Sequence, residues 1–205
     1  MRSKLNRLVT VSVFFMLGLV IAASGFQKDV FASELDLFLG KKKSTTTVYF
    51  VSDWFCPACI KVEPVIEQMY PAIAKRARIS FVDFPIHRET TNFTPYNLQF
   101  LAFEKAKYIK LRHALSEVAR KIRRPTDADV QQAVAHLGVR LRQMDNSQVL
   151  YGMQANLMVY RGYDVNATPS VVVTNARTKK SKTLVGDRQI TEQGVKDAIV
   201  EVEKK

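Results

Sequence analysis

The only two cysteines in the 205-residue sequence lie three residues apart, in Cys56-Pro57-Ala58-Cys59. Thiols with this spacing at the start of a helix are close enough to form a disulfide without a backbone movement. A bridge that closes so short a loop stabilises a fold by only about 2 kcal/mol in the chain-entropy model. We therefore expect a pair that is oxidised and reduced during function, rather than a structural crosslink.

The helix start explains how one of these thiols becomes reactive. Pro57 suits the first helical position, because its φ is already fixed and its missing N–H is not needed there. Cys56 then lies at the positive end of the helix dipole, beside unpaired backbone N–H groups that favour a thiolate. We expect Cys56 to attack a disulfide and the less accessible Cys59 to resolve the mixed disulfide that results.

A metal site is an alternative use of the two thiols. Zinc normally takes four ligands, and the histidines have no ligand-like spacing to each other or to the cysteines. These histidines are His87, His113 and His136. We expect no metal and no cofactor, since the cysteine pair can itself store two electrons. His87 is expected at the surface, without a catalytic role.

The elements that must position the thiols form a β-α-β pattern. Residues 46–51 are β-branched and aromatic, which predicts a buried strand. The segment 57–75 predicts a helix, and 79–84 predicts a second strand that ends at Pro85. A right-handed βαβ unit places the thiols at the carboxyl end of its first strand, where open α/β sheets hold their active sites.

Helical patterns dominate the middle of the chain, from about residue 95 to 162. The predicted helices are 96–110, a stretch ending at Arg124, 126–137 and 147–160, with Thr126 or Asp127 as the cap of the third. Strands are predicted again at 170–174 and 183–185, followed by a closing amphipathic helix at 192–203. The expected fold class is therefore α/β, with the helical block inserted into one α/β frame.

A second informative stretch is Ala167-Thr168-Pro169-Ser170, directly before a run of valines. Because proline cannot donate to a central sheet ladder, Pro169 belongs at the start of the strand. A cis bond between Thr168 and Pro169 would mark a tight turn there. Its exposed backbone could pair with an extended substrate peptide beside the thiols, so Thr168 and Pro169 are the candidate substrate-binding residues.

Taken together, these residues resemble the thioredoxin-fold thiol–disulfide oxidoreductases, and among them the DsbA-like exported branch. The segment 55–59, Phe-Cys-Pro-Ala-Cys, is similar to the F-C-P-x-C motif of that branch, and 167–170 is similar to its G-T-P-S cis-proline loop. Phe84-Pro85-Ile86 is similar to its F-P-L turn after a strand. The resemblance covers about residues 45–203. It implies a βαβ/ββα central sheet with an inserted helical subdomain at about 95–162.

Three departures from the DsbA pattern concern the chemistry of the thiols. DsbA has a histidine between its cysteines that helps hold the thiolate, whereas Ala58 offers neither a charge nor a hydrogen bond. Many relatives have a buried acid six residues before the first cysteine; Phe50 has that place here, and Asp53 is three residues nearer. Thr168 stands where DsbA has valine and is similar to the isomerase and reductase branches. We therefore expect a weaker oxidant than DsbA, or a reductase, since about 1.4 kcal/mol of lost thiolate stabilisation shifts the potential by roughly 30 mV.

Residues 1–26 have the pattern of an export signal. Three basic residues precede an uncharged, mostly apolar stretch at 8–26. This pattern predicts a signal peptide or, if it is not cleaved, an N-terminal membrane anchor. Residues 27–44 are then a leader, and 45–205 form the thioredoxin-like domain. Either form places the site in the periplasm or another extracytoplasmic compartment, where disulfides persist.

Much of the formal net charge of +12 is on one helical segment. Residues 104–124 contain eight Lys or Arg against two Glu, which we interpret as a solvated helical face. The alternative is attraction to acidic partners or to an anionic membrane surface. Nucleic-acid binding is not expected of an exported chain without a binding motif. The expected partners are proteins with thiols or disulfides and a membrane redox partner, and the expected state is a monomer.

The leading prediction is an exported enzyme that exchanges disulfides with protein substrates through Cys56 and Cys59. Two alternatives stay open: a redox-sensing or chaperone-like peptide-binding module without turnover, and metal delivery through the two thiols. Catalytic turnover of a disulfide substrate would separate the enzyme from the binding module. Tight binding of copper or zinc at the two thiols would indicate metal delivery.

Overall fold

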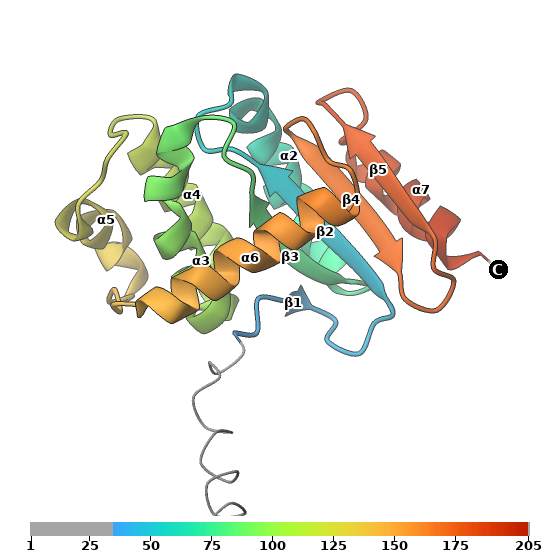
Figure 1. Cartoon of the computed structure of the whole chain (residues 1–205), viewed down its shortest axis with the longest axis horizontal. Coiled ribbons are helices and arrows are strands. Elements are labelled where there is room, and N and C mark those ends of the chain that lie inside the picture. The colour runs from blue at the N-terminus through green and yellow to red at the C-terminus, as the bar shows by residue number, and fades with distance from the viewer. Residues whose placement is uncertain (1–34, 205) are drawn as a thin grey trace, which may run out of the picture. The chain divides into compact units, whose positions relative to one another are not determined.

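The computed structural model describes residues 35–204 and has a five-stranded sheet flanked by helices (Figure 1). The signal or anchor segment predicted at 1–26 lies outside the described residues. The strands are β1 (Leu39–Gly40), β2 (Thr46–Ser52), β3 (Arg78–Asp83), β4 (Ser170–Asn175) and β5 (Ser181–Val185). They follow the order β1-β3-β2-β4-β5; β2 and β3 are parallel, and the other neighbouring pairs are antiparallel.

The helices confirm the predicted frame and its insertion. α2 (Pro57–Ala74) connects the two parallel strands, and α7 (Glu192–Glu203) closes the described chain. The insertion between β3 and β4 contains α3 (Thr94–Phe103), α4 (Tyr108–Ala119), α5 (Asp127–Val134) and α6 (Asn146–Gly162). Among residues 35–204, no helix has the length and apolar character needed to cross a bilayer.

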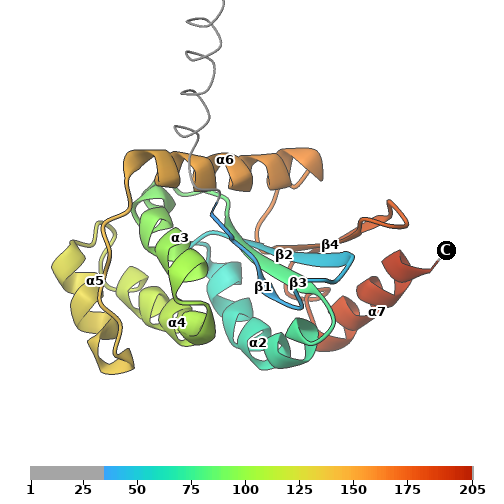
Figure 2. The same ribbon diagram turned by 90° about the horizontal axis from the view of Figure 1, so that it is seen from below.

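Helices cover both faces of the sheet (Figure 2). α6 lies across one face, and α2 and α7 lie on the other. Side chains alternate between the two faces along each strand. Phe50 of β2 therefore stacks on Phe81 of β3 at 5.1 Å between ring centroids, within the core that includes α2 and α7. The neighbouring Val51 and Val82 belong to the smaller apolar cluster that includes Tyr160 of α6.

One strand lies in the segment that we expected to be a leader. β1 pairs antiparallel with β3 through Leu39 and Gly40, at the edge of the sheet. Leu35, Leu37 and Leu39 are buried in the main core. Residues 35–40 of the expected leader are thus packed with the sheet. The alternation of these leucines with Asp36 and Phe38 is a sequence signal for an extended segment.

Two helix boundaries in the insertion differ from the prediction. The helix expected at 96–110 is interrupted, because α3 ends at Phe103 and α4 begins only at Tyr108. The stretch expected to reach Arg124 ends at Ala119. The cap of α5 is predicted correctly: the Thr126 hydroxyl accepts from Asp129 N at 3.3 Å, and the Asp129 carboxylate accepts from Thr126 N at 2.8 Å. These reciprocal bonds form a capping box.

Candidate active site

The two thiols lie where β2 ends and α2 begins, at the carboxyl end of the central strand. Cys56 is the N-cap residue of α2, with extended backbone angles (φ −74°, ψ 119°), and Pro57 is the first helical residue. Both cysteines are free thiols. Cys56 is half-buried, whereas only 4% of Cys59 is exposed. The predicted difference in access between the two sulfurs is therefore present.

The loop before β4 lies against the first thiol. The Thr168–Pro169 peptide bond is cis, and Cys56 Sγ donates to the Thr168 carbonyl oxygen over 3.6 Å. The two residues are separated by 112 positions in the sequence. The sheet brings them together because β2 and β4 are antiparallel neighbours, with Val51 opposite Ser170. All four predicted site residues, Cys56, Cys59, Thr168 and Pro169, thus belong to one site.

The surroundings shift the pKa values of the two thiols in opposite directions. Burial on its own raises the pKa of Cys56, but contacts with Thr168, Cys59 and the backbone at the start of α2 lower it below its ordinary value of 9.0. Burial raises the pKa of Cys59 to about 12, although Thr168 and the Asp53 backbone act against it. Near neutral pH, Cys56 is the thiol that more readily becomes a thiolate.

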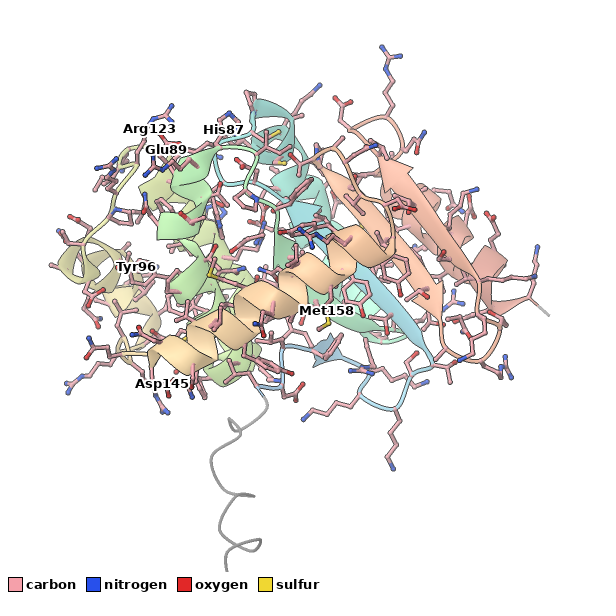
Figure 3. The ribbon with its side chains drawn as sticks, viewed as in Figure 1. His87, Glu89, Tyr96, Arg123, Asp145 and Met158 are labelled. Carbon is pink, nitrogen blue, oxygen red and sulfur yellow. The ribbon has the colours of Figure 1, made fainter. Side chains whose placement is uncertain are left out.

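Asp53 connects the thiol loop to the turn after β3. Its buried carboxylate accepts from the backbone N of Phe55 at 2.8 Å and from the backbone N of His87 at 2.7 Å. The His87 ring nitrogen Nδ1 lies 2.9 Å from the same carboxylate. We expected His87 at the surface, and its side chain is part-exposed. It lies at the end of the molecule that also holds Glu89 and Arg123 (Figure 3). Its ring is nevertheless held by Asp53, three residues before Cys56.

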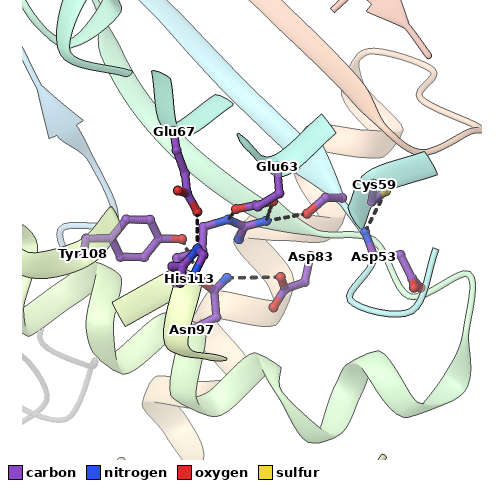
Figure 4. Close-up of polar contacts among 10 residues, drawn as sticks. Asp53, Cys59, Glu63, Glu67, Asp83, Asn97, Tyr108 and His113 are labelled. Carbon is purple, nitrogen blue, oxygen red and sulfur yellow. Dashed lines mark hydrogen bonds and ion pairs between the residues drawn. The ribbon is translucent and has the colours of Figure 1, made fainter. Parts of the chain in front are cut away.

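A buried ion pair lies behind Cys59, and the sequence analysis missed it. Arg112 of α4 donates to both carboxylate oxygens of Glu63 on α2, at 2.5 and 3.0 Å, and to Ser52 Oγ at 2.8 Å. Burial on its own would lower the pKa of Arg112, but Glu63 beside it raises that pKa, so the guanidinium stays charged. Figure 4 shows this cluster beside the contact between Cys59 and Asp53.

The solvated basic face expected at 104–124 is therefore wrong for Arg112, which is only 3% exposed. A signal for it exists in the sequence. Arg112 occupies the i+4 position from Tyr108 and the i−3 position from Leu115, on the apolar stripe of α4. Likewise, Glu63 is four residues after the buried Cys59, on the core face of α2. A charged residue in an apolar stripe indicates a buried partner.

The polar cluster extends to the end of β3. Asp83 accepts from Asn97 Nδ2 at 3.1 Å, and Asn97 Oδ1 accepts from the Tyr108 hydroxyl at 2.7 Å (Figure 4). Burial raises the pKa of Asp83 to about 6, against the lowering effect of Arg112. Two carboxylates and one guanidinium thus share the space between the sheet, α2 and the helical insertion.

A dithiol at the start of the helix after the first central strand, opposite a cis-proline loop, defines the site of a thioredoxin-fold protein. A family model described as thioredoxin matches residues 32–192, and the chain belongs to that family.

Solved structures with the same fold include periplasmic and DsbA-type proteins. A periplasmic thioredoxin-like protein from Salmonella enterica serovar Typhimurium has a TM-score of 0.60 at 17% identity, over 80% of this chain and 87% of that chain. The catalytic domain of Proteus mirabilis ScsC has a TM-score of 0.60 at 17% identity, over 82% and 89%. Pseudomonas aeruginosa DsbA2 has a TM-score of 0.55 at 15% identity, over 79% and 91%. These likenesses confirm the predicted DsbA-like fold. No curated protein sequence matches the chain.

Proposed function

We propose that this protein is an extracytoplasmic thiol–disulfide oxidoreductase that exchanges disulfides with protein substrates through Cys56 and Cys59. The observation that carries the proposal is the difference between the two thiols. Cys56 is reachable and has a lowered pKa, while Cys59 is buried with a pKa of about 12. A reachable thiolate attacks an external disulfide, and a buried thiol is suited to the intramolecular step that follows.

The reaction needs only the two sulfurs and a substrate disulfide. The Cys56 thiolate bonds to one substrate sulfur, the substrate S–S bond breaks, and the other substrate sulfur leaves as a thiolate. Cys59, once deprotonated, bonds to Cys56 Sγ, and the bond between Cys56 and the substrate breaks. The substrate is reduced by two electrons and the cysteine pair is oxidised. The reverse sequence oxidises a substrate dithiol, and neither direction uses a cofactor or a metal.

The Thr168–Pro169 segment is the proposed peptide-binding element. Its support is the contact between the Thr168 carbonyl oxygen and Cys56 Sγ, which places the segment against the attacking sulfur. An extended peptide that pairs with this backbone would bring its own sulfur to Cys56. Backbone pairing of this kind is tolerant of substrate sequence, because the hydrogen bonds involve only main-chain groups.

The direction of exchange that we propose is a weaker oxidation than that of DsbA, or reduction. Ala58 has no side-chain donor for the Cys56 thiolate, so the reduced form lacks one source of stabilisation. A membrane redox partner would set the direction in the cell. We place the protein in the periplasm, as a monomer that is either soluble after signal cleavage or held by an N-terminal anchor. The support is the apolar segment at 8–26 and the description of the Salmonella structure as periplasmic.

The test is the reduction of insulin by dithiothreitol in the presence of the protein. We expect catalytic turnover that Cys56→Ser abolishes, while the variant keeps the folded circular-dichroism spectrum. Peptide binding by the intact protein without any turnover would contradict the proposal and favour a binding module. Equilibration with glutathione measures the direction, and a potential as oxidising as that of DsbA would contradict the weaker-oxidant proposal. Mixed disulfides trapped by Cys59→Ala would identify the substrates and the redox partner.

A further inference from the structure

The second step of the proposed exchange requires a thiolate at a buried sulfur. Cys59 is only 4% exposed, and burial raises the pKa of its thiol to about 12. Near neutral pH the thiolate would be a very small fraction of this thiol. A group that donates a hydrogen bond to the thiolate would raise that fraction and speed resolution. The inference below concerns this step and therefore rests on the proposed function.

Ser52 is the polar side chain that β2 directs toward this part of the core. Phe50 and Ser52 are two positions apart, so they share the face of the strand that packs against Phe81. Ser52 therefore places a hydroxyl group on the same face as Phe50, two residues closer to the thiols. Only 5% of Ser52 is exposed.

Arg112 holds the Ser52 hydroxyl in an acceptor role. Its Nη2 donates to Ser52 Oγ over 2.8 Å, and the guanidinium is fixed by its paired bonds to Glu63. Within residues 35–204, Ser52 Oγ donates no hydrogen bond. Its O–H is therefore available, and a hydroxyl that accepts from a charged donor is itself a stronger donor.

One small cavity joins these groups to the resolving thiol. Its volume is about 10 Å³, and its lining includes Ser52, Cys59, Glu63 and Arg112. This volume is close to the minimum that a single water molecule requires. Ser52 and Cys59 therefore line the same small cavity. Glu63 also lies one helical turn after Cys59, so the ion pair adjoins the sulfur on α2 itself.

We propose that Ser52 donates its O–H to the Cys59 thiolate, directly or across this one-water cavity, and that Arg112 of the helical insertion is the positioning residue that orients Ser52. When Cys59 loses its proton to solvent, the donor stabilises the charge on sulfur. The sulfur then bonds to Cys56 Sγ, and the substrate leaves as a thiolate with the electron pair of the broken bond. The ionisable groups that line the cavity with Cys59 are Asp53, Glu63, Arg112 and Arg120. Cys56 acts on the Cys59 thiol as well, and Asp83 interacts with Arg112.

Reaction of the reduced protein with the aromatic disulfide 5,5′-dithiobis(2-nitrobenzoate) separates the two steps in one stopped-flow trace. Attack by Cys56 releases a first coloured thiolate, and resolution by Cys59 releases a second. For Ser52→Ala we expect an unchanged first phase and a second phase that is roughly tenfold slower, because one hydrogen bond to a charged group is lost. The pH profile of the second phase should move upward by about one unit. Ser52→Thr, which keeps the hydroxyl, should restore most of the rate.

Ser80→Ala is the matched control, since Ser80 is a buried serine on β3, one position before Phe81 and therefore on the opposite face of the sheet. It should leave both phases unchanged. Ser52→Val tests the same idea against Ser52→Thr, because valine has the shape of threonine without the hydroxyl; its second phase should be roughly tenfold slower than that of Ser52→Thr. This variant decides the matter if Ser52→Ala does not fold.

A second phase in Ser52→Ala as fast as in Ser80→Ala, or one in Ser52→Val as fast as in Ser52→Thr, would overturn the inference. Loss of the first phase in the wild-type protein would instead reject the proposed function. The two failures are therefore distinguishable in the same experiment.

Discussion

Cys56 and Cys59 occupy one turn of one helix, yet their surroundings give their sulfurs different chemistry. Cys56 lies at the N-cap, against Thr168 and beside the backbone N–H groups of the first turn. Cys59 is one turn further on, in the core, where its polar contact is the backbone N of Asp53 at 3.5 Å. The same residue type is acidified at one position and made more basic at the other, because the balance of burial and hydrogen bonds differs.

This contrast predicts selective alkylation of the reduced protein. Near neutral pH, iodoacetamide should modify Cys56 and spare Cys59, because only Cys56 has an appreciable thiolate fraction. The rate for Cys56 should rise through a midpoint below 9.0, the ordinary value that its surroundings lower. Mass spectrometry of the digested protein locates the label. As a control, Cys56→Ala should leave Cys59 unmodified until strongly alkaline pH. Equal labelling of both cysteines in the wild-type protein would contradict the assignment.

Asp83 gives a pH-dependent prediction for stability. Burial raises its pKa from 3.8 to about 6 in the folded protein. The folded state therefore holds an extra proton between these values, and stability falls as the pH rises through this window. Asp83→Asn should be more stable than the wild type near pH 7, by about 2–3 kcal/mol at 1.36 kcal/mol per pKa unit. The difference should vanish as the pH falls toward 4.

Urea unfolding at several pH values measures this difference. The amide oxygen of the variant can still accept from Asn97, so the bond that Asp83 makes at 3.1 Å is kept. Asp197→Asn, at an exposed carboxylate on α7, is the control, and it should stay within about 0.5 kcal/mol of the wild type at each pH. A wild type that is more stable than Asp83→Asn near pH 7 would show that the Arg112 charge outweighs burial.

At the scale of elements, local chemistry predicts most of the frame. The β-branched run that begins at Thr46, the proline after Cys56 and the capping box at Thr126 each fix an element through neighbours in sequence. The candidate site is predictable for the same reason, because Cys56 and Cys59 are three positions apart at a helix start and Pro169 precedes an evident strand.

What could not be predicted depends on partners that are distant in sequence. β1 has only two residues and forms because Leu39 and Gly40 pair with β3 at the edge of the sheet. The partner of Glu63 is 49 residues away, so its sequence neighbourhood shows a charged residue in an apolar stripe but not which residue neutralises it. His87 likewise meets Asp53 across 34 residues. Tertiary contacts, rather than local preference, decide these features.

The packing of α6 against α3 gives a prediction for a helix in contact with its neighbour. Gly152 is buried in α6, and a Cβ at this position would overlap the Leu98 side chain, which is itself fully buried. Gly152→Ala should lower the free energy of unfolding by about 1–3 kcal/mol, because the core must shift to admit a methyl group.

Gly162→Ala in the same helix is the matched control. A Cβ at Gly162 would meet nothing within 4 Å. This variant should be neutral or gain up to about 1 kcal/mol, since alanine favours a helix over glycine. Urea denaturation compares the two variants. If Gly152→Ala were as stable as Gly162→Ala, the close approach of α6 to α3 would not require a glycine at position 152.

At the scale of the whole molecule, the helical insertion and the sheet are joined by charged groups as well as by apolar packing. Lys105 donates to the carbonyl oxygens of Asp36 and Phe38, at 2.6 and 2.9 Å, and so fixes the chain before β1 to the turn between α3 and α4. Arg112 reaches from α4 to α2 and β2, and its guanidinium lies 4.7 Å from the Trp54 ring centroid. Much of the basic segment 104–124 thus has structural partners.

The buried ion pair between Arg112 and Glu63 gives a prediction for how much the contact between the helical insertion and α2 contributes to stability. Arg112→Met should destabilise the protein by roughly 3–5 kcal/mol, because the Glu63 carboxylate is left buried without its counter-charge. The double variant Arg112→Met with Glu63→Leu should recover most of this loss, since an apolar pair of similar volume removes the desolvation cost of both charges. Urea unfolding of the two variants measures the effect. If the double variant were as unstable as Arg112→Met, the contribution of Arg112 would lie in its bond to Ser52 and its contact with the Trp54 ring. The insertion would then be fastened by a hydrogen bond and ring packing, and charge neutralisation would be secondary.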